Sequence, residues 1–115
     1  MKRLSLSTIL LTATICSAET YKVTFYCSCV KCCNKSDGIT ASGVKAHWGT
    51  VANNWLPFKT QLKIEGFDNT FTVLDRGSKK HFGTKTEQRK RLDIWCPDHK
   101  SALEWGVRYL KVEVL

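Results

Sequence analysis

The sequence predicts a small, mainly β protein, a closed barrel of short strands accompanied by one short helix. Three observations favour this fold class. The chain has 115 residues, which leaves room for one domain. Short runs of β-branched and aromatic residues recur along it, and turn-forming Gly, Ser, Asn or Pro separates them. Only one stretch, near the C-terminus, carries the start and stop signals of a helix.

The first predicted strands flank a loop rich in cysteine. Residues 21–26 (YKVTFY) alternate between apolar and polar side chains, as a half-buried strand does. The cysteine-rich loop follows at 27–33, and turn formers continue it at 37–43. A short apolar fragment at 51–54 predicts the next strand, and Pro57 ends it because proline cannot sit in a central strand.

A hairpin and one more strand are predicted in the middle of the chain. Residues 61–65 (QLKIE) and 70–74 (TFTVL) both favour strands, and the turn formers at 66–69 join them. After a polar, basic loop the chain becomes apolar again at 92–95 (LDIW), which predicts a further strand.

The helix and the last strand are predicted in the C-terminal part. Asp98 is a candidate N-cap, and Gly106 stands where a left-handed C-terminal cap favours glycine. The apolar side of this helix consists of Ala102, Leu103 and Trp105. The last strand is expected at 107–115, with a buried face made of Val107, Tyr109 or Leu110, Val112 and Val114.

Residues 1–18 have the organisation of a secretory signal peptide. A basic start at Lys2 and Arg3 precedes an apolar stretch, and small residues allow cleavage after Ala18. The predicted mature domain is 19–115, and no segment of it is long and apolar enough to cross a membrane. We therefore expect an exported protein, located in the periplasm, the cell wall or the extracellular medium.

The chain is strongly basic, with a net charge of +8. Removal of the leader leaves about +6, which favours anionic partners such as cell-wall polymers. Seven Lys and Arg residues fall between Arg76 and Arg91. No recognition helix or aromatic-interleaved motif accompanies them, so nucleic acid is not the predicted partner. A solvated loop is the simplest interpretation of this basic stretch.

Five cysteines remain in the predicted mature chain: Cys27, Cys29, Cys32, Cys33 and Cys96. All are disulfide candidates, because disulfide bonds are the usual state of cysteine in exported proteins. The odd number leaves one thiol over, and the connectivity stays open. A zinc site is the rival interpretation, since C-x-C-x-x-C-C offers four thiolates, although without the usual C-x-x-C spacing. We expect disulfides, and neither a metal nor another cofactor.

Asp93 is the unusual residue of the 92–95 strand, because it places a carboxylate inside an apolar run. A carboxylate removed from water must be paired or must raise its pKa. A carboxylic acid that stays protonated near neutral pH is the group with which glycosidases protonate a leaving oxygen. The alternative is that Asp93 points outward on an alternating strand and has no catalytic role.

An ordered set of blocks spans nearly all of the predicted mature chain. They are Thr40–Gly43, Val51–Asn54, Leu56–Pro57, Leu62–Gly66, Val73–Gly77, Leu92–Trp95 and Trp105–Arg108. In this order and spacing they resemble the three-aspartate (3D) domain, which is found in membrane-bound lytic transglycosylase A and in secreted wall-remodelling proteins of the stationary-phase-survival type. The cysteine-rich segment before the blocks is also similar to that of some secreted members.

The resemblance implies a six-stranded double-psi β-barrel with a peptidoglycan-binding groove. We expect the protein to be a monomer. Two of the three aspartates stand here as Asp75 and Asp93, and Asn54 occupies the position of the first. Asp93 matches the residue that acts as the acid in the transglycosylases. The resemblance therefore implies a lytic transglycosylase that cleaves the bond between N-acetylmuramic acid and N-acetylglucosamine, with Asp93 as general acid and base.

Asp75 is the second catalytic candidate, although capping of the turn at Arg76-Gly77 explains it equally well. The candidates for contact with the glycan are Thr40, Ser42, Asn54, Arg76 and Trp95. Trp48, Trp55 and Tyr26 are further stacking candidates, each of which also suits a core position. His81 and His99 are expected at the surface without partners.

Two other functions remain open at this stage. Expansin-like double-psi barrels bind or loosen polysaccharide without cleaving it, and the loss of the first aspartate at Asn54 favours such a wall-binding module. The second alternative is an exported effector whose barrel is a scaffold for the basic loop, with Lys79, Lys80, Lys90 and Arg91 as its functional residues.

Overall fold

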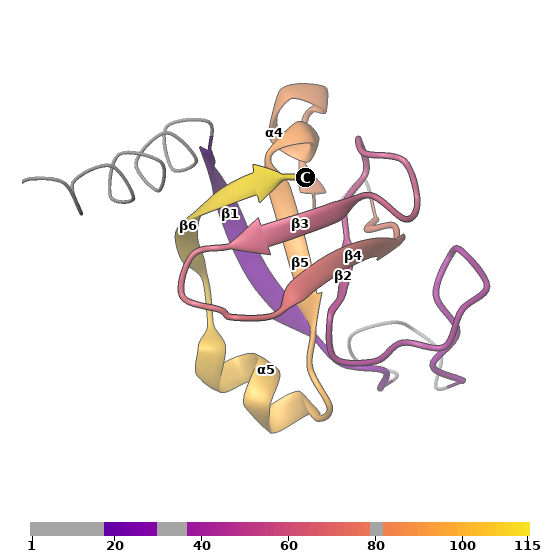
Figure 1. Ribbon diagram of the computed structural model, residues 1–115. Helices are drawn as coiled ribbons and strands as arrows, with labels where there is room; N and C mark the ends of the chain where they lie inside the picture. Colours follow the sequence, from indigo (N-terminus) through magenta and orange to yellow (C-terminus); the bar gives the residue numbers. More distant parts are fainter. Residues whose placement is uncertain (1–17, 30–36, 79–81) are drawn as a thin grey trace, which may run out of the picture.

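The computed structural model describes residues 18–29, 37–78 and 82–115. These residues form six strands and two short helices, and the strands close into one barrel (Figure 1). In chain order the elements are β1 (Glu19–Tyr26), β2 (Thr50–Ala52), β3 (Gln61–Ile64), β4 (Thr70–Asp75), α4 (Lys85–Arg89), β5 (Arg91–Trp95), α5 (His99–Trp105) and β6 (Arg108–Val114). The prediction of a mainly β, six-stranded barrel is confirmed.

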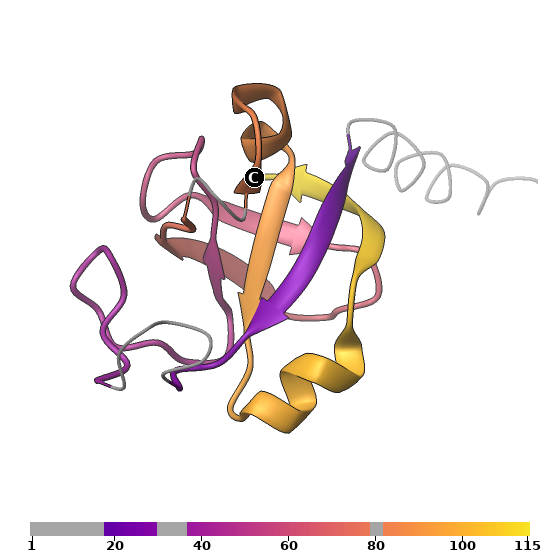
Figure 2. The ribbon, with the colours of Figure 1, turned by 180° about the vertical axis from the view of Figure 1, so that it is seen from behind.

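The barrel mixes parallel and antiparallel pairs. Its strand order is β1-β5-β2-β4-β3-β6, and β6 closes the barrel against β1. The pairs β1–β5 and β2–β4 are parallel, whereas the other pairs are antiparallel. Figure 2 shows β1 and β5 side by side on one face of the barrel. Because these two strands run in the same direction, their C-terminal residues Tyr26 and Trp95 are register partners at one edge.

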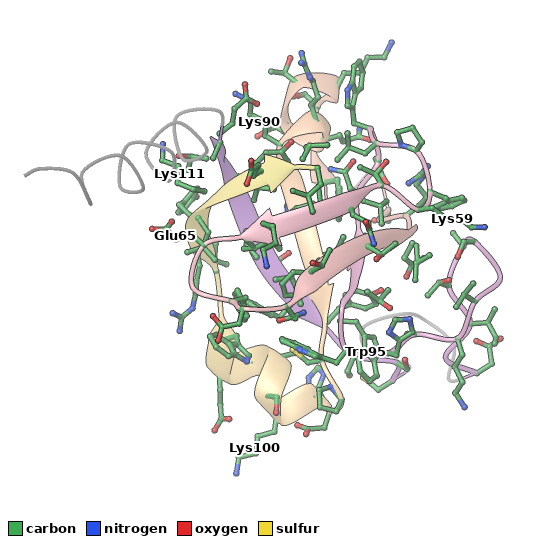
Figure 3. The ribbon with its side chains drawn as sticks, in the orientation of Figure 1. Lys59, Glu65, Lys90, Trp95, Lys100 and Lys111 are labelled. Carbon is green, nitrogen blue, oxygen red and sulfur yellow. The ribbon has the colours of Figure 1, made fainter. Side chains whose placement is uncertain are left out.

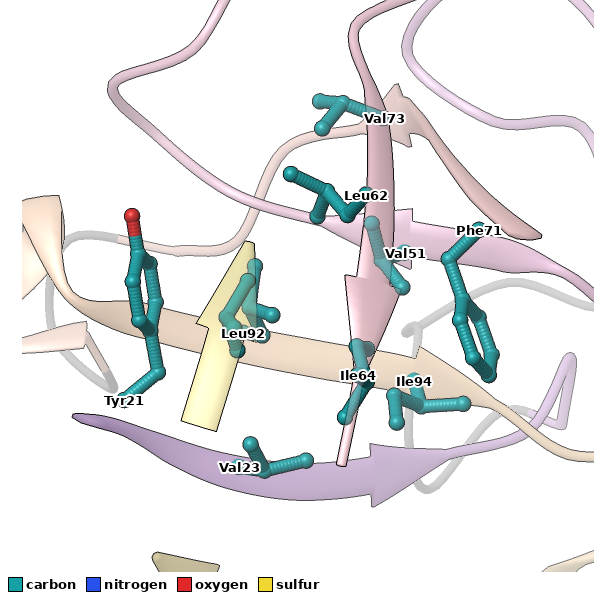
Figure 4. Packing of buried hydrophobic residues seen from close by; sticks show 10 residues of the cluster. Tyr21, Val23, Val51, Leu62, Ile64, Phe71, Val73, Leu92 and Ile94 are labelled. Atoms are coloured by element: carbon teal, nitrogen blue, oxygen red, sulfur yellow. The ribbon is translucent and has the colours of Figure 1, made fainter. Parts of the chain in front are cut away.

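Apolar side chains from every strand fill the barrel (Figure 4). This core cluster consists of Tyr21, Val23, Val51, Leu62, Ile64, Phe71, Val73, Leu92, Ile94 and Val112. The core cluster forms because successive side chains of a strand point to opposite faces, so that every second residue points into the barrel. Full burial of each such aliphatic or aromatic side chain stabilises the fold by about 1.5–3 kcal/mol relative to exposure.

A β-bulge interrupts the pairing of β2 with β4. Val51 pairs with Val73, but the next residue, Ala52, pairs with Asp75, so that Leu74 is the extra residue. Regular alternation after Phe71 and Val73 would have turned Asp75 toward the core. The inserted residue changes the phase, and bulges re-aim side chains in this way at functional sites. Asp75 is consequently half-buried rather than part of the core cluster.

The C-terminal helix is the one that the sequence predicts. Asp98 is the N-cap of α5, its side chain accepting from the Ser101 amide, and Gly106 is the C-cap with φ 66°. Of the expected apolar side only Ala102 is buried, whereas Leu103 is 68% exposed. Trp105 is 37% exposed and stacks on Phe25, with the ring centroids 5.2 Å apart.

The second helix, α4, was not predicted, and the expectation of a single helix is wrong. It occupies part of the basic loop, where charge made a solvated loop the simplest interpretation. Thr84 and Glu87 form a capping box: each side chain is bonded to the backbone amide of the other residue. The signal T-x-x-E is present in the sequence, and it outweighs the absence of any buried residue in this helix.

The buried face of the last strand differs from the prediction. In β6, Val112 is buried and Leu110 is half-buried, but Val107, Tyr109 and Val114 are all exposed. The predicted burial of Val112, an even-numbered position, is correct. Val107 and Tyr109 are exposed because odd-numbered side chains point away from the face of Val112. Val114 shares the face of Val112 but is the last residue of β6 and is exposed.

The surface is basic on several sides. Lys59, Lys90, Lys100 and Lys111 project from different parts of the barrel (Figure 3). No helix within residues 18–29, 37–78 and 82–115 has the length and hydropathy of a membrane span. The predicted leader lies outside the described residues apart from Ala18.

Candidate active site

Asp93 is the central residue of β5. Its neighbours Leu92 and Ile94 are fully buried in the core, so Asp93 stands on the outer face of the barrel. Its register partners are Thr24 on β1 and Ala52 on β2. The carboxyl group thus points outward, as the simpler interpretation expects, and yet the side chain is half-buried by its surroundings.

The carboxyl group of Asp93 is poorly solvated. Its Oδ1 atom is buried and has no hydrogen-bond partner among the described residues. Burial raises the pKa of Asp93 to about 6, and the negative charge of Asp75 adds to this effect, whereas the Thr24 hydroxyl and Arg91 lower the pKa. Such a carboxyl group is partly protonated at mildly acidic pH, as a general acid requires.

Three hydrogen bonds orient the carboxyl group of Asp75, the last residue of β4. The Tyr26 hydroxyl donates to Oδ2 at 2.8 Å. The backbone amides of Ala41 and Arg76 donate to Oδ1 at 2.8 and 2.9 Å. The expected turn-capping role is therefore present in the bond to Arg76, and the other two bonds connect Asp75 to β1 and to the 37–46 loop.

The two aspartates lie on either side of Ala52. This residue pairs with Asp93 on β5 and, through the bulge, with Asp75 on β4. Neighbouring strands are about 4.8 Å apart, so the backbones of the two aspartates are separated by roughly 10 Å. The structure thus places both catalytic candidates on strands next to β2. The side chain that lies between them is the methyl group of Ala52.

An apolar group shares this outer face and accounts for the poor solvation of Asp93. It consists of Tyr26, Ala52 and Phe82, with Trp95 packed against them. The indole Nε1 of Trp95 donates to the Ser28 hydroxyl at 2.8 Å. Trp95, predicted to contact the glycan, therefore stands two residues from Asp93 with its ring held in place.

Gly77 allows this group to pack closely. A Cβ atom at position 77 would lie 2.0 Å from the Phe82 ring, which is a severe overlap. The glycine in the block Val73–Gly77 is thus explained by the approach of Phe82.

Thr40 and Ser42 belong to the loop that covers Asp75. Thr40 donates its hydroxyl hydrogen to the Val44 carbonyl at 2.6 Å, and its Oγ1 lies 2.9 Å from the Ser42 hydroxyl. A small pocket beside Asp75 is lined by Tyr26, Ser28, Gly38, Ile39, Thr40, Ala46 and Asp75. Thr40 therefore lines the pocket, whereas Ser42 supports the loop.

The amide of Asn54 is used within the protein. Its Nδ2 donates to the Gly77 carbonyl at 2.9 Å and to Gln88 Oε1 at 3.0 Å. Its Oδ1 accepts from the Gly77 amide at 2.8 Å. An aspartate could not donate the first two bonds, so asparagine suits this position, and Asn54 joins the end of β2 to the loop after β4 and to α4.

Arg76 also has a partner within the chain. Its guanidinium donates to the Asn53 carbonyl at 2.8 Å and lies 4.0 Å from the centre of the Phe58 ring. The structure does not bring it into the group around Asp93 through any described contact. Arg76 remains exposed, so a glycan contact at its surface side stays a prediction.

The other aromatic candidates differ in their surroundings. Trp48 packs its ring on Phe67 and Phe71, with centroids 5.9 and 5.6 Å apart. Trp55 is 60% exposed, and the Arg89 guanidinium lies 5.0 Å from its ring centre. Trp55 is therefore an accessible stacking surface outside the group around Asp93.

Two functional features were missed by sequence reasoning. Tyr26 was expected only as a stacking ring, but its hydroxyl anchors Asp75. The fully buried Asn53 accepts from the amides of Trp55 and Leu56 and donates to the Arg91 carbonyl at 2.9 Å. The alternation of 21–26 puts Tyr26 on the polar face of the strand, which indicates that its side chain makes contacts outside the core. No comparable pattern in the sequence indicates the role of Asn53.

The cysteine predictions are answered only in part. No disulfide bond joins any two of the described cysteines, Cys27, Cys29 and Cys96, whereas Cys32 and Cys33 lie outside the described residues. The expectation for His99 is wrong: it is half-buried, and its Nδ1 lies 3.5 Å from the Cys29 sulfur. His81 lies outside the described residues.

No protein-family model matches the chain, and no curated protein sequence matches it. The resemblance to the three-aspartate domain accordingly rests on the ordered blocks of the sequence.

Proposed function

We propose that the protein is a lytic transglycosylase-like enzyme that cleaves the bond between N-acetylmuramic acid and N-acetylglucosamine in peptidoglycan. The observation that carries this proposal is the poorly solvated carboxyl group of Asp93, whose pKa is raised to about 6. Its position across Ala52 from a second, firmly oriented carboxyl group supports the same chemistry. The sequence blocks supply the substrate class, and the basic surface suits an anionic wall polymer.

In the proposed reaction one carboxyl group serves twice. Asp93 donates its proton to the glycosidic oxygen while the bond between this oxygen and C1 of the muramic acid breaks. The C6 hydroxyl oxygen of the same sugar bonds to C1, and its proton passes to the Asp93 carboxylate. The products are a 1,6-anhydro-muramic acid end and a free N-acetylglucosamine hydroxyl, and no water is consumed.

Asp75 has a supporting role in this proposal. Its negative charge raises the pKa of Asp93 and so favours the acid form before the reaction. The same charge stabilises the positive character that develops at C1 in the transition state. The hydrogen bond from Tyr26 and those from the two amides hold it in one orientation.

The test is digestion of purified sacculi by the protein obtained from the full-length chain, with mass spectrometry of the released muropeptides. Asp93→Asn is compared with Asp68→Asn, because Asp68 is an exposed aspartate in the turn between β3 and β4. We expect anhydro-muropeptides from the wild type and from Asp68→Asn, and a loss of at least a hundredfold in Asp93→Asn.

Other products would change the conclusion. Reducing-end muropeptides that disappear in Asp93→Asn would keep the site and make the reaction a hydrolysis. Release that persists at the wild-type rate in Asp93→Asn would remove Asp93 from the mechanism.

A non-catalytic, expansin-like wall-binding module is the second candidate function. The exposed ring of Trp55, with Arg89 beside it, favours this function because an aromatic face stacks on a sugar and a cation pairs with an acidic stem peptide. Sedimentation with sacculi would show weaker binding by Trp55→Ala than by Leu103→Ala, an exposed apolar control. Binding without release of any muropeptide would favour the module over the enzyme.

A further inference from the structure

A cluster of two cysteines and one histidine lies at the end of β1, apart from the group around Asp93. The sulfur atoms of Cys27 and Cys29 are 3.0 Å apart. The Nδ1 atom of His99 lies 3.8 Å from the Cys27 sulfur and 3.5 Å from the Cys29 sulfur. One donor atom from each residue thus falls within 4.8 Å of the others.

These distances are close to those of a tetrahedral zinc site. Zinc binds sulfur at about 2.3 Å and imidazole nitrogen at about 2.0–2.1 Å, which separates a sulfur and a nitrogen ligand by roughly 3.6 Å and two sulfurs by roughly 3.8 Å. The two observed sulfur–nitrogen distances bracket the expected value. The sulfur–sulfur distance is about 0.8 Å short, and a small shift of the Cys29 side chain, which is half-buried and lies beyond the end of β1, corrects it.

The fold brings these three donors together from two elements. Cys27 is the first residue after β1, and its side chain is 2% exposed. His99 is the first residue of α5, a helix that packs against β1. The N-cap Asp98 fixes the start of this helix by accepting from the Ser101 amide at 2.8 Å. The positions of Cys27 and His99 are thus set by the strand and the helix next to them, whereas Cys29 lies in the loop after β1.

We infer that Cys27, Cys29 and His99 bind a zinc ion, which has a structural role. Two thiolates and an imidazole form a donor set that selects zinc over oxygen-preferring ions such as magnesium or calcium. A structural site requires a fourth donor. The Cys96 backbone lies close by, because its amide donates to the Tyr26 carbonyl at 2.6 Å, but its sulfur is not one of the donor atoms that lie within 4.8 Å of one another, so the described residues supply three ligands.

Such an ion would fix the backbone next to Tyr26, the residue whose hydroxyl donates to Asp75. Tyr26 and Ser28 stand on either side of Cys27, and their hydroxyls bond to Asp75 and to the Trp95 indole. The zinc site is independent of the proposed glycan chemistry, because its test reads metal content rather than muropeptide release.

The test begins with the protein produced from the full-length chain without an affinity tag. Zinc per chain is measured by plasma mass spectrometry, and the cysteines are alkylated under denaturing conditions and counted by mass. We expect about one zinc per chain and no bond between Cys27 and Cys29. Replacement of zinc by cobalt(II) should produce the visible absorption of a tetrahedral, thiolate-bound ion. This measurement uses the wild-type protein, so it does not require a variant to fold.

Two variants identify the ligands. His99→Gln and Cys29→Ser should lose their zinc to a chelator that leaves the wild type loaded, whereas His47→Gln, an exposed histidine outside the cluster, should keep it. A wild-type protein that neither contains nor takes up zinc would overturn the inference. A disulfide between Cys27 and Cys29, or equal zinc retention in all variants, would also overturn it.

Discussion

At the scale of single residues, the state of Asp93 follows from its neighbours. Its outer-face position would normally leave a carboxylate in water, but Tyr26, Ala52, Phe82 and Trp95 occupy the same face. Removal from water disfavours the charged form more than Arg91 and the Thr24 hydroxyl favour it. The residue therefore combines access from the surface with the pKa of a buried acid.

The raised pKa of Asp93 makes the free energy of unfolding depend on pH. Between about pH 4 and pH 6 the folded chain holds the Asp93 proton that the unfolded chain has released, so stability should fall as pH rises through this range. A pKa that rises from 3.8 to about 6 corresponds to at most about 3 kcal/mol. In Asp93→Asn this part of the pH dependence should vanish. Urea unfolding at several pH values measures it, and Asp68→Asn should retain the wild-type slope.

Asn54 offers a second test at this scale. Asn54→Asp would place a carboxylate oxygen against the Gly77 carbonyl and Gln88 Oε1, where the amide now donates. We expect a loss of about 1–3 kcal/mol in the free energy of unfolding at pH 7, because two bonds become repulsive contacts. Chemical denaturation measures this value, with Asn69→Asp as the loop control. An unchanged stability would show that an aspartate is accommodated at this position.

At the scale of elements, the bulge between β2 and β4 is the decisive irregularity. Without the extra residue Leu74, the alternation that buries Phe71 and Val73 would also bury Asp75. The periodic pattern of 70–74 predicts the strand correctly, but a bulge has no clear signal in a single sequence. The strands and α5 were therefore predictable, whereas the outward orientation of Asp75 was not.

The last strand provides a test of how burial decreases toward its end. Val112→Ala removes a side chain that is 2% exposed and should cost about 2 kcal/mol. Val114→Ala changes a residue of the same strand that is 46% exposed, and should cost less than about 0.7 kcal/mol. Thermal and chemical unfolding of the two variants compares them directly. Equal losses would contradict the observed difference in burial between the middle and the end of β6.

At the scale of the whole molecule, the net charge of +8 is not confined to the basic loop. Arg89 and Arg91 of that loop lie over the rings of Trp55 and Phe82, while lysines project elsewhere on the barrel (Figure 3). Lys79 and Lys80 lie outside the described residues. A distributed charge attracts an anionic polymer as a whole and does not single out one loop.

This distribution of charge predicts how the proposed binding to the cell wall responds to salt and to charge reversal. Raising the salt concentration from 0.05 to 0.5 M should weaken binding to sacculi several-fold, because screening shortens the range of the attraction. Lys85→Glu in α4 and Lys100→Glu in α5 should weaken binding to a similar extent, as both side chains are exposed. Sedimentation assays measure both effects. A loss confined to Lys85→Glu would instead support a barrel that serves as scaffold for the basic loop.

The candidate site shows where sequence reasoning stops. Asp93 could be identified because a carboxylate in an apolar run is unusual in itself. The tasks of Tyr26 and His99 could not, because the first depends on a contact across the barrel and the second on the packing of α5 beside β1. Both contacts join residues that are far apart in the chain, and local pattern carries no information about them.

Closure of the barrel by its first and last strands also bears on how the chain can be rearranged. Glu19 at the start of β1 is the register partner of Val112 in β6, three residues before Leu115. A linker of about four residues, which spans up to roughly 14 Å, should therefore connect Ala18 to Leu115. A circular permutant with new ends in the exposed turn at Glu65-Gly66 would keep all six strand pairs. It would lose only the covalent connection between β3 and β4.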